Sequence, residues 1–205
     1  VRADGDMPSP LRRRRQVVQR RMLLLIDISG SMRDHTRDHL DLAHAAVQGA
    51  RETEVFTLGT RLTRITPSLR TADRNRARAR VSGLVEDWDG GTRLGPTLLS
   101  FLGIPRFANL ARGAAVLILS DGLERGDPAE MALACRRLAA RAHRLSLCTP
   151  LAADPRFRPE TAALSAILPV LDDLVDGSSV PALTRFILSL GQPAPPARDL
   201  WRKAA

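Results

Sequence analysis

Two continuous apolar runs, each ending in an aspartate, constrain the fold of this chain more than any other feature. The first is LLLID, residues 23–27, and the second is AAVLILSD, residues 114–121. A short, continuous apolar run bounded by polar residues is typical of a strand that is buried on both faces of a parallel sheet. An aspartate at the end of such a strand requires something that pairs its charge. The two runs therefore raise the question of what lies beside Asp27 and Asp121.

The rest of the chain alternates between strand and helix patterns. We expect further strands in a hairpin over 54–65 that turns at Gly59-Thr60, then over 144–151 and 167–171; we expect helices over 33–51, 73–86, 97–103, 128–142 and 180–190. This alternation predicts a doubly wound α/β fold with helices on both faces of the sheet. Ligands of such sheets bind beyond the carboxyl ends of the strands, where the strand order reverses. If the two acidic strands are neighbours there, both aspartates reach one crevice.

The two ends of the chain differ in composition from its middle. Residues 1–19 are rich in proline and arginine and predict a flexible basic arm, residues 20–190 predict one domain, and residues 191–205 predict a proline-rich tail. The net charge is +9, so the arm has two interpretations: a solvated segment, or a segment that binds an acidic protein surface or nucleic acid. Aromatic residues do not interleave with its arginines, which argues against stacking on bases.

Compartment signals are few. No apolar run approaches the roughly 20 residues of a membrane-spanning helix. Cys135 and Cys148 fit no metal-binding spacing, and we interpret both as buried thiols of a cytoplasmic protein. The first residue is Val1, which fits a fragment or a processed chain and leaves a targeting segment open.

A set of oxygen-bearing side chains surrounds the two acidic strand ends. Asp27, Ser29 and Ser31 alternate along one loop, Thr92 follows two glycines, and Asp121 supplies a second carboxylate. Oxygen ligands of this kind suit Mg²⁺, with Mn²⁺ or Ca²⁺ as alternatives, and they do not suit zinc. If the hydroxyls bind directly and the acids act through water, the ion would seek a carboxylate from outside the chain.

Three motifs carry a resemblance to a known family. DISGSM (27–32), GGT (90–92) and SDG (120–122) resemble the metal-ion-dependent adhesion site of von Willebrand factor A (VWA) domains. The resemblance implies metal ligation by Asp27, Ser29, Ser31, Thr92 and Asp121, and capture of a partner's Asp or Glu. It also implies a Rossmann-like sheet of six strands, mostly parallel, with one short antiparallel edge strand from the hairpin.

A closer resemblance is to CoxE-like proteins. It rests on EVFTLGTRLTRITPSL (54–69), GGTRLGPTLLSFL (90–102), LSDGLERGDP (119–128) and LCTPL (147–151). It implies a bacterial accessory protein that works with a MoxR-type AAA+ ATPase to mature a molybdenum–copper carbon monoxide dehydrogenase-like enzyme. The residues expected to contact the partner are Arg93, Gly91, Gly122 and Glu124, and the alternative for Arg93 is a salt bridge to Asp87 or Asp89.

Several sharper interpretations are less well supported. A metal-dependent phosphohydrolase is disfavoured because the motifs contain no general base and no phosphate-binding loop, so we expect no enzymatic activity. An RNA- or DNA-binding VWA protein is supported by charge alone. RGD, residues 125–127, fits a helix start with Asp127 at the N-cap. His35 and His39 lie four residues apart and lack a third ligand, so we expect an exposed helix surface there.

Overall fold

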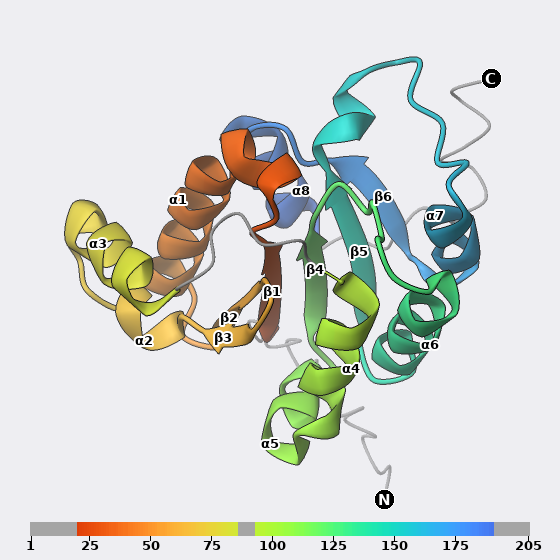
Figure 1. The fold of residues 1–205 in the computed structure, drawn as a ribbon. Helices are drawn as coiled ribbons and strands as arrows, with labels where there is room; N and C mark the ends of the chain where they lie inside the picture. Colours follow the sequence, from red (N-terminus) through yellow and green to blue (C-terminus); the bar gives the residue numbers. More distant parts are fainter. Residues whose placement is uncertain (1–19, 86–92, 191–205) are drawn as a thin grey trace, which may run out of the picture.

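A six-stranded sheet forms the centre of the protein in the computed structural model, which describes residues 20–85 and 93–190 (Figure 1). The strands are β1 (Met22–Asp27), β2 (Thr53–Leu58), β3 (Leu62–Arg64), β4 (Ala115–Leu119), β5 (Arg144–Thr149) and β6 (Asp173–Asp176). Their order is β3-β2-β1-β4-β5-β6, and only the pairing of β2 with β3 is antiparallel. The predicted α/β fold, with one short antiparallel edge strand supplied by the hairpin, is confirmed. The predicted arm and tail lie outside the described residues.

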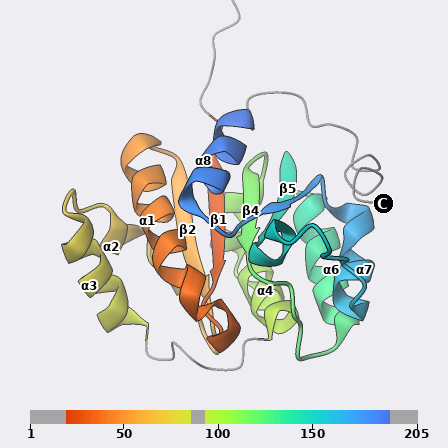
Figure 2. The same cartoon turned by 90° about the horizontal axis from the view of Figure 1, so that it is seen from above.

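Helices cover both faces of the sheet (Figure 2). The α-helices are α1 (Arg33–Gly49), α2 (Thr66–Leu69), α3 (Arg74–Leu84), α4 (Leu94–Gly103), α5 (Pro105–Ala108), α6 (Pro128–Ala139), α7 (Ala162–Ile167) and α8 (Val180–Ser189). Short 3-10 helices are η1 (Gly30–Met32), η2 (Asn109–Ala111), η3 (Pro150–Ala153) and η4 (Leu168–Val170). Successive residues of a strand point to opposite faces. Leu24 and Ile26 of β1 therefore pack with α1, α2, α3 and α8, whereas Leu23 and Leu25 pack with α4, α6 and α7.

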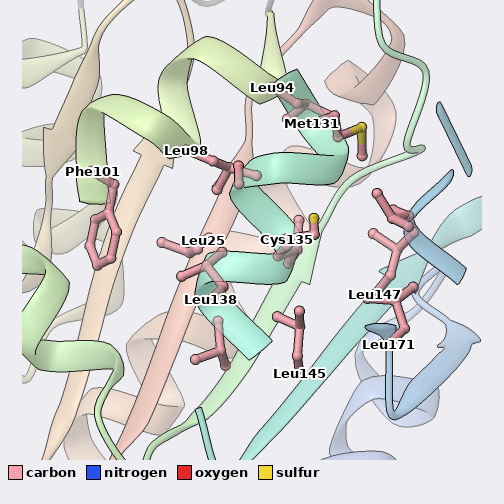
Figure 3. Packing of buried hydrophobic residues seen from close by; sticks show 14 of the residues in the cluster. Leu25, Leu94, Leu98, Phe101, Met131, Cys135, Leu138, Leu145, Leu147 and Leu171 are labelled. Atoms are coloured by element: carbon pink, nitrogen blue, oxygen red, sulfur yellow. The ribbon is translucent and has the colours of Figure 1, made fainter. Parts of the chain in front are cut away.

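Helical spacing explains how α4 and α6 cover their face of the sheet. Both helices present a buried residue every three or four positions, which places these residues on one stripe. The stripe residues that Figure 3 labels are Leu94, Leu98 and Phe101 of α4, and Met131, Cys135 and Leu138 of α6. They pack over sheet residues such as Leu25, Leu145 and Leu147. This packing fixes where α4 begins, close to the carboxyl ends of the strands.

The strand order reverses between β1 and β4. The chain passes from β1 to β2, which pairs with one edge of β1. It later returns as β4, which pairs with the opposite edge of β1. In this parallel pair Ile26 lies opposite Leu119. Asp27 and the Ser120-Asp121 pair therefore leave the sheet side by side. The sequence left open whether the two acidic strands are neighbours at the reversal point, and the structure shows that they are.

The last strand is displaced from its predicted position. Residues 167–171, expected to be a strand, end α7 and form η4, and the strand is β6. Asp173 begins β6, and its carboxylate is buried and accepts two hydrogen bonds of 2.7 Å from the guanidinium of Arg144 on β5. In the sequence, a strand that begins with an aspartate resembles a loop when the arginine that pairs with it lies far away along the chain. Parallel pairing with β5 makes this segment a strand, and the buried ion pair compensates the charge of Asp173.

The prediction of an exposed histidine surface on the first helix is wrong. His39 is fully buried, and its Nε2 lies 2.9 Å from the carbonyl oxygen of Gly177, which supplies the hydrogen-bond acceptor that a buried imidazole needs.

Other sequence-based predictions are confirmed. Cys135 and Cys148 are buried free thiols, as predicted. Asp127 is the N-cap of α6 and accepts a hydrogen bond from the backbone N–H of Ala129, also as predicted. Among the described helices, none has the length and apolar character needed to cross a bilayer.

Candidate metal centre

The turn that follows β1 gathers an acid and two hydroxyls. Asp27 is 1% exposed, and its Oδ1 accepts a hydrogen bond of 2.9 Å from the backbone N–H of Ser29. The hydroxyl oxygens of Ser29 and Ser31 lie 3.1 Å apart. The chain then forms the 3-10 turn η1, whose Met32 is fully buried and anchors the loop. The alternating pattern of the sequence therefore produces two hydroxyls on one short turn beside Asp27.

Ser120 holds the second carboxylate oxygen of Asp27. The hydroxyl of Ser120 donates a hydrogen bond of 2.6 Å to Oδ2 of Asp27, and its oxygen accepts one of 3.0 Å from the backbone N–H of Gly122. The sequence places Ser120 in the SDG motif, but the motif alone predicted no role for this side chain. Its position in the chain could have indicated this role. Leu119 of β4 is paired with Ile26 of β1, so the next residues, Ser120 and Asp27, lie beside each other.

Asp121 brings a second negative charge to the same edge. It is 5% exposed, and its Oδ1 accepts a hydrogen bond of 2.9 Å from the backbone N–H of Leu123. Burial raises the pKa of Asp27, the hydrogen bonds from Ser120 and Ser29 lower it in part, and the charge of Asp121 raises it further. Two acids whose charges act on each other, one of them desolvated, favour a bound cation.

The other predicted site residues divide into two groups. Thr92 and Gly91 lie outside the described residues. Arg93 is exposed at the N-cap of α4, and Gly122 is buried with a positive φ of 72°. Glu124 is half-buried, and its two carboxylate oxygens accept hydrogen bonds from the backbone N–H groups of Gly95 and Gly126, each at 2.6 Å. Contact of these residues with a partner stays a prediction.

The donor set that the structure brings together fits a hard cation. Its members are the carboxylates of Asp27 and Asp121 and the hydroxyls of Ser29 and Ser31. Across the described parts of the chain, no group of three or more histidine, cysteine, aspartate or glutamate side chains is arranged to hold a metal. An ion at this edge would therefore depend on hydroxyl ligands in addition to the two acids. Oxygen ligands of this kind are those that Mg²⁺ prefers in proteins.

Comparison with known proteins agrees with this architecture. The family described as "VWA domain containing CoxE-like protein" matches residues 2–182. No curated protein matches the chain at the level of sequence.

The solved structures that resemble this chain share little sequence identity with it, and two of them reach a TM-score of 0.50. Proximal thread matrix protein 1 from the mussel byssus is 14% identical, with a TM-score of 0.50, over 85% of this chain and 48% of that one. The pilus adhesin SpaC from Lactobacillus rhamnosus GG is 13% identical, with a TM-score of 0.50, over 90% of this chain and 31% of that one. The SpRpn10 VWA domain is 14% identical, with a TM-score of 0.48, over 78% of this chain and 88% of that one. This chain thus spans about half of the byssus protein and about a third of the adhesin.

Proposed function

The chain belongs to the family of VWA domain containing CoxE-like proteins, and on this premise we propose that it is a metal-dependent protein-binding module that captures an acidic side chain of its partner. VWA domains mediate protein–protein interaction, which is the general role that family membership supports. The specific proposal is that Mg²⁺, with Mn²⁺ or Ca²⁺ as alternatives, binds where β1 and β4 end.

One observation carries this proposal: oxygen-bearing side chains from two distant segments meet at the point where the strand order reverses. Asp27, Ser29 and Ser31 come from the turn after β1, and Asp121 follows β4. Thr92 is the fifth proposed ligand, on sequence grounds. When bound, Mg²⁺ would supply a positive centre that accepts a carboxylate from outside the chain.

The hydrogen bonds of Asp27 suit a residue that holds a metal ion. Such a residue needs a fixed orientation, which hydrogen bonds from neighbouring groups supply. Both carboxylate oxygens of Asp27 already accept hydrogen bonds, one from the N–H of Ser29 and one from the hydroxyl of Ser120. This acid is therefore held in one orientation. A fixed orientation suits a ligand that must hold an ion in place, and each oxygen keeps a second lone pair for the ion or for its bound water.

The partner is proposed from the family resemblance. We propose a MoxR-type AAA+ ATPase, its client molybdenum–copper enzyme, or both, with the exposed Arg93 pairing with the incoming carboxylate. The basic helix α3 gives the nucleic-acid alternative limited support. Arg78 binds Asp41 of α1 through two hydrogen bonds, and Arg74 lies 3.6 Å from the same carboxylate, so these two charges are already partly compensated.

The test is binding of the candidate ATPase to the purified chain in Mg²⁺ and in EDTA. Wild-type protein should bind only in Mg²⁺, and Ser29→Ala should lose this binding while its metal-free unfolding temperature stays close to that of wild type. Ser100→Ala is the matched control, because Ser100 is exposed on α4 and its hydroxyl donates a hydrogen bond to the carbonyl of Pro96 in the same helix. Equal binding by Ser29→Ala, or equal binding in EDTA, would contradict the proposal.

A further inference from the structure

The carboxylate of Glu124 joins two segments that border the proposed metal centre. Glu124 lies in the loop between β4 and α6, three residues after Asp121. Its Oε2 accepts a hydrogen bond from the N–H of Gly95 in α4, and its Oε1 accepts one from the N–H of Gly126, each at 2.6 Å. Hydrogen bonds to an ionised acceptor at such short distances are about twice as strong as neutral ones.

The hydrogen bond from Gly95 to Glu124 matters because of where Gly95 lies in α4. Gly95 is the second residue of α4, and the first N–H groups of a helix have no partner within the helix. A carboxylate at this end also interacts favourably with the helix dipole. Glu124 therefore fixes the start of α4 relative to the loop that carries Asp121. Arg93, which follows the predicted ligand Thr92 in the chain, is the N-cap of the same helix.

Close packing leaves little space between the start of α4 and the backbone of α6. A Cβ atom added to Gly95 would lie 2.6 Å from the backbone nitrogen of Met131 and 3.0 Å from the carbonyl carbon of Glu130. The first turn of α4 thus rests directly on the backbone of α6. Gly126, the other residue bound by Glu124, directly precedes Asp127, the N-cap of α6. One side chain therefore links the start of α4 to the loop that runs from Asp121 to the N-cap of α6.

We infer that Glu124 is a positioning residue: it sets the relative placement of the Asp121 loop and the start of α4, and through that placement the affinity of the metal centre. This inference rests on the proposed function. It differs from the sequence-based prediction that Glu124 contacts the partner, because both carboxylate oxygens already accept backbone hydrogen bonds. A partner that used this carboxylate would have to compete with these two bonds.

The test is titration of the purified chain with Mn²⁺, followed by electron paramagnetic resonance, and with Mg²⁺ in competition. In Glu124→Gln one of the two N–H groups faces an amide NH₂ group in place of an oxygen. Loss of a group that hydrogen-bonds directly to a metal ligand typically weakens metal affinity by roughly 10–100-fold. Glu124 acts on the backbone beside the ligands, so we expect a loss at the lower end of this range, about tenfold. The matched control is Glu130→Gln, which removes the same charge from an exposed position in the first turn of α6. It should bind within about twofold of wild type.

Unfolding measurements separate positioning from a purely structural role. Mg²⁺ should raise the unfolding temperature of wild type and of Glu130→Gln, since a ligand that binds only the folded state stabilises it. At the same Mg²⁺ concentration the rise should be smaller for Glu124→Gln. If Glu124→Gln lowers only the metal-free unfolding temperature and binds metal as wild type does, the inference is wrong. It is also wrong if this variant binds metal normally but loses the partner.

A second variant covers the case in which Glu124→Gln does not fold. Glu124→Asp keeps the charge but is one methylene shorter, so it reaches one of the two N–H groups at a time. An affinity between those of wild type and the expected value for Glu124→Gln supports the inference, and wild-type affinity overturns it. If wild-type protein itself takes up no Mg²⁺ or Mn²⁺, the proposed function fails, and the inference fails with it.

Discussion

The hydroxyl of Ser120 donates a 2.6 Å hydrogen bond to Oδ2 of Asp27, although the two residues are 93 positions apart in the chain. Both are buried, at the carboxyl ends of the adjacent strands β4 and β1. The same hydroxyl oxygen accepts the N–H of Gly122. The orientation of the Asp27 carboxylate is thus set by the residue that follows the neighbouring strand β4, as well as by the loop after β1.

Ser120→Ala should destabilise the metal-free protein. It leaves Oδ2 of a buried carboxylate without a donor, which costs about 1–3 kcal/mol of unfolding free energy. Urea denaturation in EDTA measures this loss. Ser100→Ala, on the exposed side of α4, should change the unfolding free energy by less than about 0.5 kcal/mol. Equal midpoints for the two variants would show that the Ser120 hydrogen bond contributes nothing.

Gly122→Ala should lower the free energy of unfolding more than Gly113→Ala does, because only the new methyl group at position 122 clashes with another side chain. Both glycines have positive φ, 72° and 65°, which costs an L-residue roughly 1–2 kcal/mol. A Cβ on Gly122 would lie 2.5 Å from Cδ2 of the buried Leu164, whereas a Cβ on Gly113 meets nothing within 4 Å. Overpacking adds about 1–3 kcal/mol to the loss of unfolding free energy for Gly122→Ala. Denaturant unfolding of the pair isolates this contribution, and a smaller loss for Gly122→Ala would refute it.

Glu54 should make stability depend on pH in the acidic range. Burial raises its pKa, but hydrogen bonds from Arg64 and Thr66 and the charges of Arg64 and Arg70 outweigh this effect, so the pKa lies below its ordinary value of 4.5. The folded state therefore binds the proton more weakly than the unfolded state does. The resulting stability is present above pH 4.5 and is lost as the pH falls through the lower, folded-state pKa.

Comparison with Glu54→Gln measures this contribution. The difference in unfolding free energy between wild type and Glu54→Gln should be largest at neutral pH and should shrink as the solution is acidified below pH 4.5. Urea denaturation at a series of pH values gives the difference directly. A difference that stays constant from neutral pH to about pH 3 would contradict the assigned pKa shift.

Local patterns were enough to predict most of the fold. The apolar runs ending at Asp27 and Asp121 predicted two buried strands of a parallel sheet, and the structure has them as β1 and β4. The alternation of Asp27, Ser29 and Ser31 predicted a turn that gathers oxygens, and the serine hydroxyls lie 3.1 Å apart. Each of these features depends on residues that are close in sequence, so periodicity and spacing are sufficient to reveal it.

Interactions between distant segments account for what local patterns missed. The strand β6 begins with Asp173, whose buried carboxylate is compensated by Arg144 and Ser146, and the buried His39 is hydrogen-bonded to the carbonyl oxygen of Gly177. Likewise, the hydrogen bond between Glu124 and Gly95 joins the loop after β4 to the first turn of α4. A sequence read alone gives the charge of each of these groups but not the partner that compensates it.

The sequence by itself determined which residues carry oxygen at the strand ends and that two such ends belong to one parallel sheet. The tertiary structure decided that Ser120 orients Asp27 and that Glu124 ties the Asp121 loop to α4. The physical reason is that a buried polar group must find its hydrogen-bond partner in space. That partner is chosen by strand order and helix packing, which no local pattern of residues contains.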